Sequence, residues 1–274
     1  MTKTILAALS VAILITGPAA ADDAPAAIRA AVDSPQRSAE NRARDKYRHP
    51  VEALEFFGLR PDMSVVEIWP GRAGWWTEIL APLLRDEGAL TAVIFGDQTD
   101  KFRDFMLSAN EDFRARVAAD ADMYGDVTVT SMWAPGQLFI AADGSADMVL
   151  AMRNLHNWLA WGQTDDVLAT LYRVLKPGGI LAVVDHRLPG DQAGDPGFRS
   201  GYVNEELAVR TIEAAGFELV GRSEINANPK DTADHPAGVW TLPPTLTLGE
   251  KDRDKWLAIG ESDRFTLKFR KPAD

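Results

Sequence analysis

The sequence predicts an α/β protein with a doubly wound, mainly parallel sheet, because short apolar runs rich in β-branched residues alternate with helical patterns. The apolar runs stand at residues 65–69, 89–95, 127–130, 148–152 and 180–184. Apolar residues at helical spacing fill most of the intervals between them. Because parallel strands need crossover connections, we expect helices on both faces of the sheet.

The expected helices have recognisable starts and stops. They span residues 50–58, 99–119, 163–175 and 204–215. Pro50 suits a first helical turn, Asn204 is a good N-cap, and Gly58 and Gly216 stand where helices end. Two further strands are expected at residues 217–225 and 264–269.

The first residues resemble a secretory signal. Lys3 precedes an apolar run at residues 5–15, and an A-x-A site predicts cleavage after Ala21. The run is too short for a convincing membrane span, although an uncleaved anchor is an alternative. We therefore expect a periplasmic or secreted protein, with a tail or short helix at residues 22–47 that is loosely docked at its start and the main domain at residues 48–274.

Composition narrows the classes of partner. The 274-residue chain has a formal net charge of −11 and no cysteine. The missing cysteines exclude disulfides and thiolate metal sites, and the acidic balance disfavours a nucleic-acid partner. The basic stretch at residues 42–46 is expected to be a solvated helix face.

Residues 65–80 predict a strand, a glycine turn and a helix start near Trp75. Gly71 and Gly74 allow a tight turn, and the free amide groups of the following helix favour an anionic ligand. Glu67, close to the strand end, is placed to bind a cationic group. Nicotinamide, flavin and S-adenosylmethionine all suit such a turn, and a plain β-turn-α connection is the alternative.

The element order, ending in two strands, resembles the class I S-adenosylmethionine-dependent methyltransferase superfamily from about Arg48 onward. The clearest motifs are the turn after Glu67, DMVLAMRNLHNW at residues 147–158 and VLKPGG at residues 174–179. Together with the terminal SDRFTLKFRKP, they resemble an uncharacterised group of predicted methyltransferases with signal peptides. The resemblance implies a Rossmann-like sheet of seven strands, the last of them antiparallel, and S-adenosylmethionine as cofactor.

The resemblance also implies cofactor-binding residues. Glu67 matches the acidic residue that helps hold the methionine amino group, and Gly71 matches the glycine nearest the cofactor. Trp69, Pro70 and Gly74 complete the expected turn. The chain departs from the D/E-x-G-x-G-x-G pattern, because Trp69 and Ala73 replace its first and third glycines.

The ribose and adenine positions are less well matched. The family places an acidic residue at the end of the second strand, where this chain has Ile94, and the nearest acid is Asp97. Asp97 is therefore our candidate for the ribose, although a loop cap is an equal interpretation. Residues 131–133, ending in Trp133, are expected near the adenine.

Polar residues follow the fourth strand, where related enzymes face the transferring methyl group. Arg153, Asn154 and His156 are our candidate catalytic residues, with His156 as general base. A structural histidine is the alternative. Asp185 and His186 end the fifth strand at the same rim, and with His156 they have ligand types suited to a divalent metal, but their spacing is not diagnostic and we predict none.

Several other residues have two interpretations. The tryptophans at positions 69, 75, 76, 133 and 158 either wall a sulfonium or flat ligand, or pack in the core. Residues 226–255 form an expected insertion that is either a lid or a surface loop. Tyr202 and Arg264 are near enough in the predicted topology to reach the site, although Arg264 is better explained as the start of an edge strand with a surface salt bridge.

These observations leave distinct functional hypotheses. The first is a methyltransferase acting on a small-molecule or lipid-like acceptor. The second is an exported, non-catalytic binding or assembly protein, because S-adenosylmethionine is made in the cytoplasm and two cofactor motifs are degraded. A nicotinamide-dependent oxidoreductase is the third, and it lacks a clear glycine pattern.

Overall fold

The computed structural model describes residues 23–96, 103–190, 192 and 194–273. The predicted signal peptide and Asp97 lie outside these residues. Within them, no helix is both long enough and apolar enough to cross a membrane.

The described residues form one central sheet of eight strands, and a short additional strand lies apart from it. The strands are β1 (Ser64–Ile68), β2 (Ala89–Phe95), β3 (Thr128–Met132), β4 (Ala146–Met152), β5 (Leu175–Leu188), β6 (Val203–Asn204), β7 (Glu218–Ser223), β8 (Pro236–Val239) and β9 (Arg264–Arg270). The main path of the sheet runs β3-β2-β1-β4-β5-β9-β7, and β6 pairs with β5 beside it. The seven predicted strands are thus confirmed as the main path.

Strand direction also agrees with the prediction. Strands β1 to β5 are mutually parallel, whereas β9 runs antiparallel to both of its neighbours, β5 and β7. The last strand in sequence is therefore interior to the sheet. Its amino end consequently lies at the edge where β1 to β5 have their carboxyl ends.

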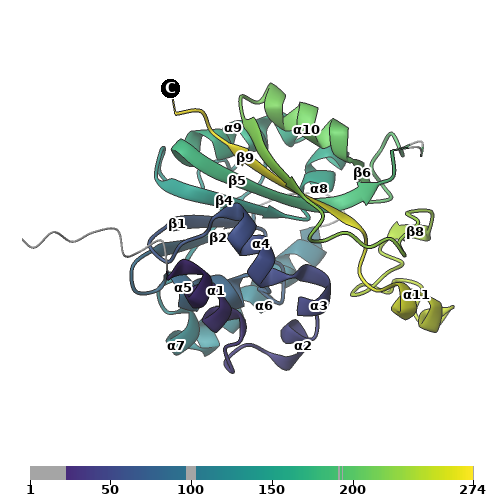
Figure 1. Ribbon diagram of the computed structural model, residues 1–274, viewed down its shortest axis with the longest axis horizontal. Helices are drawn as coiled ribbons and strands as arrows, with labels where there is room; N and C mark the ends of the chain where they lie inside the picture. The colour runs from purple at the N-terminus through teal and green to yellow at the C-terminus, as the bar shows by residue number, and fades with distance from the viewer. Residues whose placement is uncertain (1–22, 97–102, 191, 193, 274) are drawn as a thin grey trace, which may run out of the picture.

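Helices cover both faces of this sheet (Figure 1). They are α1 (Ala24–Val32), α2 (Ala39–Arg42), α3 (Asp45–Arg48), α4 (Pro50–Phe57), α5 (Thr77–Leu84), α6 (Arg103–Ala119), α7 (Ala121–Tyr124), α8 (Leu155–Ala160), α9 (Thr164–Val174), α10 (Glu205–Ala214) and α11 (Arg253–Ile259). Pro50 and Asn204 begin helices as predicted, and the Asn204 side chain accepts a hydrogen bond from the Leu207 amide at 3.1 Å.

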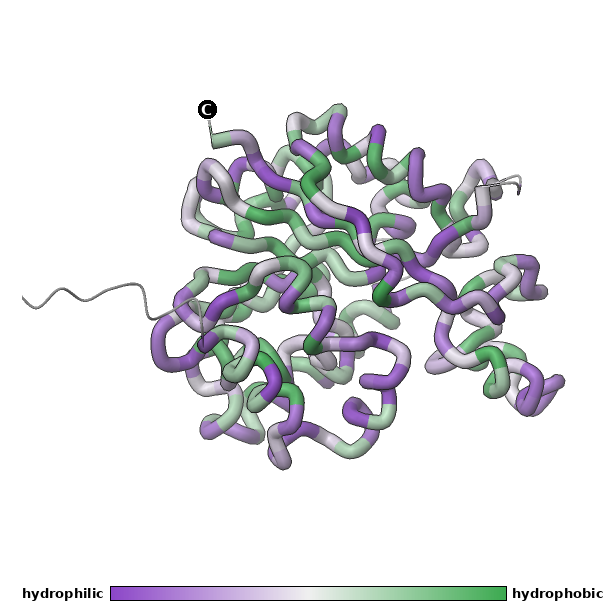
Figure 2. Tube along the Cα trace, in the orientation of Figure 1, coloured by the Kyte–Doolittle hydropathy of each residue, from purple (hydrophilic) through white to green (hydrophobic). Residues whose placement is uncertain are grey.

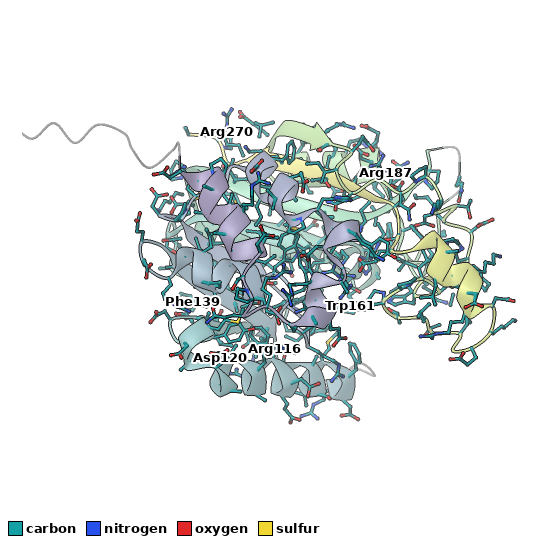
Figure 3. All side chains as sticks on the ribbon, turned by 60° about the horizontal axis from the view of Figure 1, so that its bottom comes forward. Arg116, Asp120, Phe139, Trp161, Arg187 and Arg270 are labelled. Atoms are coloured by element: carbon teal, nitrogen blue, oxygen red, sulfur yellow. The ribbon has the colours of Figure 1, made fainter. Side chains whose placement is uncertain are left out.

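Alternating side chains of the strands form two large cores, one on each face of the sheet. Val66 and Ile68 of β1 pack with α8, α9 and α10, whereas Val65 packs with α1, α4 and α5 on the other face. The hydropathy of the trace shows the same arrangement, with hydrophobic segments concentrated along the strands (Figure 2). Side chains fill the space between the sheet and its helices (Figure 3). Because both faces of the sheet are covered, polar side chains that could bind a ligand are expected at the ends of the strands.

The amino-terminal segment is integrated into this core. The expectation of loose docking is wrong for α1, because Ile28 is buried against α4 and α5 residues and Val32 lies in the same cluster. Helices α2 and α3 continue from it toward the carboxyl edge of the sheet. They bring arginine side chains to that edge, as described below.

Candidate functional site

The turn after β1 contains a buried carboxylate. Glu67 is 2% exposed, and the Thr77 hydroxyl donates a hydrogen bond to its Oε2 at 2.7 Å. Burial raises the pKa of Glu67 to about 7, although the bond from Thr77 lowers it. A cationic group beside this carboxyl would stabilise its ionised form. The resemblance implies that the methionine amino group is such a cation.

The backbone of this turn has the left-handed conformation at three positions. Trp69 has φ 48°, Gly71 has φ 70° and Gly74 has φ 53°. A side chain on Gly71 would meet no atom within 4 Å, so the space beside this glycine is open. Trp69 holds a conformation that costs a bulky residue about 1 kcal/mol or more. Its packing must offset that cost.

Trp69 is the centre of an aromatic cluster at the ends of β1, β2 and β3. Its ring centroid lies 4.8 Å from that of Phe95 and 6.3 Å from that of Trp133. It also lies 6.1 Å from Trp158 and 5.8 Å from Trp161. The indole nitrogens of Trp69 and Trp158 are buried and have no hydrogen-bond partner among the described residues. Of the two earlier interpretations, the cluster therefore supports core packing, with two unused donors inside it.

This cluster occupies the region expected for adenosine. The ribose position falls beside Phe95 and Ile94, and Trp133 stands at the expected adenine position. The Trp69 ring lies within contact distance of both Phe95 and Trp133. The Trp69 indole therefore lies in the region where the resemblance implies the adenosine part of S-adenosylmethionine.

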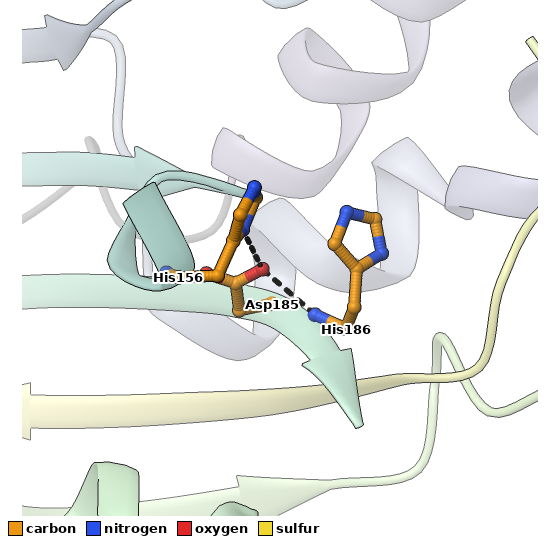
Figure 4. A group of neighbouring side chains, drawn as sticks. All are labelled: His156, Asp185 and His186. Carbon is orange, nitrogen blue, oxygen red and sulfur yellow. Dashed lines mark hydrogen bonds and ion pairs between the residues drawn. The ribbon is translucent and has the colours of Figure 1, made fainter. Parts of the chain in front are cut away.

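His156, which follows β4, and Asp185, near the end of β5, form a buried pair (Figure 4). His156, in the first turn of α8, is 5% exposed, and Asp185 in β5 is 0% exposed. The His156 Nδ1 lies 2.8 Å from Asp185 Oδ1, and the His156 amide donates to Oδ2 at 2.9 Å. Because an ionised carboxylate only accepts hydrogen bonds, Nδ1 carries the proton and Nε2 is left as the acceptor.

His186 lies next to this pair. Its ring centroid is 5.2 Å from that of His156, and its amide donates to Asp185 Oδ1 at 2.8 Å. Burial, followed by the nearby His156 and arginine charges, lowers the pKa of His186 well below its usual value. His186 is therefore neutral at neutral pH and unsuited to a role as a general acid.

The predicted insertion reaches the same site. Trp240, from residues 226–255, has its ring 6.0 Å from that of His156. Tyr202 lies 6.2 Å from His186, ring to ring, and its hydroxyl donates to Asp231 at 3.0 Å. The contact with Trp240 suits a lid, which stays a prediction, and Tyr202 reaches the site as expected.

The three possible metal ligands do lie together. Potential ligand atoms of His156, Asp185 and His186 are all within 4.8 Å of one another. The surrounding charge, however, is unfavourable for a cation, because arginines from several elements act on the same residues. Both oxygens of Asp185 and the Nδ1 of His156 already take part in hydrogen bonds within this group.

The prediction for Arg264 is wrong, and the prediction of a solvated helix face at residues 42–46 is wrong for Arg44, although Arg42 and Lys46 are exposed. Arg264 is 3% exposed and begins an interior strand, and Arg44, from the stretch expected to be solvated, has a side chain only 18% exposed. Both bind the buried Glu261, Arg44 at 2.7 Å and Arg264 at 3.2 Å. Arg48 binds the same carboxylate at 3.3 Å. No local signal predicts this cluster, because its members come from segments more than 200 residues apart.

The other candidate catalytic residues have different environments. The Asn154 side chain donates to the Ile68 carbonyl at 2.8 Å and thereby ties the end of β4 to the end of β1. Arg153 has φ 65°, and within the described residues its side chain has no hydrogen bond or ion pair. Burial and neighbouring arginines lower the pKa of Arg153 to about 10. Arg153 thus lies among charges of both signs, those of the arginines and of Glu261 and Asp185, and has no hydrogen-bonded partner among the described residues.

Comparisons with known proteins agree with this architecture. Residues 110–183 match the model of a methyltransferase domain. A search of curated proteins finds no match. Among solved structures, a SAM-dependent methyltransferase from Aquifex aeolicus is similar with a TM-score of 0.55 and 17% identity, over 90% of this chain and 98% of that one.

Two further structures widen the comparison. The [4+2]-cyclase SpnF has a TM-score of 0.52 and 18% identity, over 89% of this chain and 85% of that one. Phosphoethanolamine N-methyltransferase 2 of Haemonchus contortus has a TM-score of 0.55 and 16% identity, over 82% of this chain and 53% of that one. The chain thus has the class I methyltransferase fold, and residues 110–183 match a methyltransferase domain within it.

Proposed function

We propose that the protein is a methyltransferase that transfers the methyl group of S-adenosylmethionine to a small-molecule or lipid-like acceptor. The observation that carries this proposal is the His156–Asp185 pair, which stands at the same sheet edge as the Glu67 turn. The pair provides a general base beside the region where the methionine part of the cofactor would bind.

The chain's own residues have separable roles in this proposal. Glu67 binds the amino group of the cofactor, and Gly71 lets the ligand approach the backbone. When bound, S-adenosylmethionine supplies an electrophilic methyl group. Most of the rate enhancement then comes from alignment of the acceptor with that methyl group, as in other enzymes that position two reactants.

His156 is the proposed base. Asp185 holds the Nδ1–H tautomer, so that Nε2 can accept a proton from a hydroxyl or similar acceptor. The buried carboxylate also stabilises the imidazolium that this transfer creates. Asn154 serves as a positioning residue, because its bond to the Ile68 carbonyl sets the distance between the two loops.

We also propose that the protein is exported. The support is the predicted signal at residues 1–21 of the sequence. Mass determination of the protein purified from cell-envelope fractions tests this. A mature chain that begins at Asp22 is expected, and a full-length chain found in the cytoplasm would contradict export.

Calorimetric titration with S-adenosylmethionine and S-adenosylhomocysteine tests the function. We expect binding that Glu67→Ala abolishes, because the amino group then loses its carboxylate. Asp62→Ala is the matched control, since Asp62 is an exposed acid paired with Arg60 on the surface. Absence of binding by the unmodified protein would contradict the proposal.

A non-catalytic binding protein is the second candidate, and the position of Trp69 favours it. The Trp69 ring packs where adenosine is expected, which suits a chain that kept the fold and lost the cofactor. The cyclase SpnF, named for a different reaction, has a similar fold, so the fold alone does not fix the activity. Measured methyl transfer would eliminate this candidate.

A further inference from the structure

A cluster of arginines surrounds the inner side of the candidate site. Arg44 and Arg48 come from the α3 region, Arg153 follows β4, and Arg264 begins β9. Arg48 and Arg264 are each about 96–97% buried. The Arg48 guanidinium also packs on the Trp75 ring, 4.7 Å from its centroid, which fixes its position.

Negative charge in the described residues does not balance this cluster. Glu261 binds Arg44, Arg48 and Arg264, and Asp185, which is hydrogen-bonded to His156, also acts on Arg153 and Arg264. Asp263 acts on Arg264 as well, but it is paired with Arg187. Four guanidinium groups therefore share two carboxylates, those of Glu261 and Asp185. An unbalanced buried charge is costly unless something neutralises it.

Unused donors mark where a neutralising group would bind. The Nη2 atoms of Arg44 and Arg48 are buried and have no partner among the described residues. Arg153, whose side chain has no ion pair there, interacts electrostatically with the same Glu261. Burial, followed by repulsion between the arginines, lowers the pKa values of Arg48 and Arg264. Planar guanidinium donors match the oxygens of carboxylate and phosphate groups.

We propose that Arg44, Arg48 and Arg153 form a binding site for an oxyanion, a carboxylate or phosphate group, beside His156. This inference deepens the proposed function by naming the chemistry of a ligand, and its binding test does not depend on methyl transfer. The oxyanion belongs either to the acceptor or to the methionine carboxylate of the cofactor. In both cases the anion would complete the neutralisation of the arginines.

Calorimetric titration of the purified protein with inorganic phosphate, and in parallel with acetate, tests the site at an ionic strength held constant with chloride. We expect saturable binding that Arg153→Gln weakens at least about tenfold and Arg153→Lys weakens less, since lysine keeps the charge without the planar fork. Arg222→Gln is the matched control, because Arg222 is a surface arginine paired with Glu205 and Glu206.

Glu261→Gln provides a second variant with the opposite expectation. Without the competing carboxylate, phosphate should bind several-fold more tightly and should raise the melting temperature more than in the unmodified protein. The absence of phosphate and acetate binding to the unmodified protein would overturn the site. Equal binding by Arg153→Gln and the unmodified protein would overturn it as well.

Adenosyl ligands distinguish the two sources of the oxyanion. If the cofactor supplies it, S-adenosylhomocysteine displaces phosphate, and Arg153→Gln weakens S-adenosylhomocysteine but not 5′-methylthioadenosine, which lacks the carboxylate. If the acceptor supplies it, phosphate binds in the presence of saturating S-adenosylhomocysteine. If neither adenosyl compound binds, the proposed function fails while the phosphate titration still decides the oxyanion site.

Discussion

The Nδ1 of His156 lies 2.8 Å from a carboxylate oxygen of Asp185, and both side chains are buried. The same carboxylate accepts hydrogen bonds from the His156 and His186 amides, so its orientation is fixed from three directions. Such a pair keeps the imidazole in one tautomer and one ring orientation. A buried histidine with its Nε2 free is what a base at this strand edge requires.

Replacing His156 with Ala should slow methyl transfer by about tenfold or more and leave cofactor binding intact, because the base is lost and the cofactor turn is unchanged. Asp185→Asn should slow turnover as well, since an amide no longer fixes the tautomer. Steady-state kinetics and calorimetry measure the two effects separately. An unchanged rate in His156→Ala would remove His156 from the mechanism.

The control for Asp185→Asn is Asp147→Asn. Asp147 is also a carboxylate that accepts from a side chain, Lys176, and from a backbone amide, that of Ser64. It lies at the opposite edge of the sheet. Asp147→Asn should therefore affect stability without lowering the turnover of folded protein.

Glu67 should make the ligand-free protein less stable as the pH rises. Its folded pKa is about 7 against an ordinary value of 4.5, so between these values the folded state binds more protons than the unfolded state. Stability is then lost as the pH rises through this window, by about 3 kcal/mol in total. Glu67→Gln removes this loss. Urea unfolding of both proteins at about pH 5 and pH 8 measures the difference, and parallel pH profiles would contradict it.

Cofactor binding should have the opposite pH dependence. An amino cation binds the ionised form of Glu67, so below pH 7 binding must release a proton. The affinity for the cofactor should therefore fall about tenfold for each unit by which the pH is lowered below 7. Calorimetry in buffers of different ionisation enthalpy detects the released proton. A pH-independent affinity for S-adenosylhomocysteine would show that Glu67 does not contact the amino group.

Glu261 should stabilise the fold against acid. Burial alone would raise its pKa, but Arg48, Arg264 and Arg44 together hold it well below its ordinary value. Its contribution is present above the ordinary pKa, near 4.5, and is lost as the pH falls below it. Glu261→Gln should destabilise the neutral protein by about 3 kcal/mol or more, because buried arginines lose their partner. Urea unfolding at neutral and acidic pH should show the difference shrinking with acid.

Local patterns predicted most of the fold. The continuous apolar run of β2 gave its bounds, and the cap at Asn204 gave the start of α10, because these signals depend on neighbouring residues. The burial of Arg264 was not predictable in this way. The last strand inserts between β5 and β7, and its arginine meets partners from the amino-terminal helices. Pairings between segments so distant in sequence leave no periodic signal.

The candidate site was predicted in part for the same reason. His156 and Asp185 were both expected at the carboxyl edge, since parallel strands end there together. Their direct pairing and the shared carboxylate Glu261 emerge only from the packed structure. Trp69 was recognised as a departure from the glycine pattern. Its left-handed backbone and its packing with Phe95 explain how a tryptophan is tolerated there.

Trp69→Gly should show whether the Trp69 indole fills the space expected for adenosine or instead lines the cofactor pocket. Glycine accepts φ 48° without strain, but the loss of the indole leaves a cavity among Phe95, Trp133 and Trp158, so the variant should be less stable by about 2 to 4 kcal/mol. If the indole occupies the space of adenosine, S-adenosylhomocysteine should bind the folded variant more tightly than the unmodified protein. Phe57→Gly is the control, because Phe57 of α4 is a buried aromatic residue in the other core. Weaker binding by Trp69→Gly would instead show that the indole contacts the cofactor, and the aromatic cluster would then be a wall of the pocket.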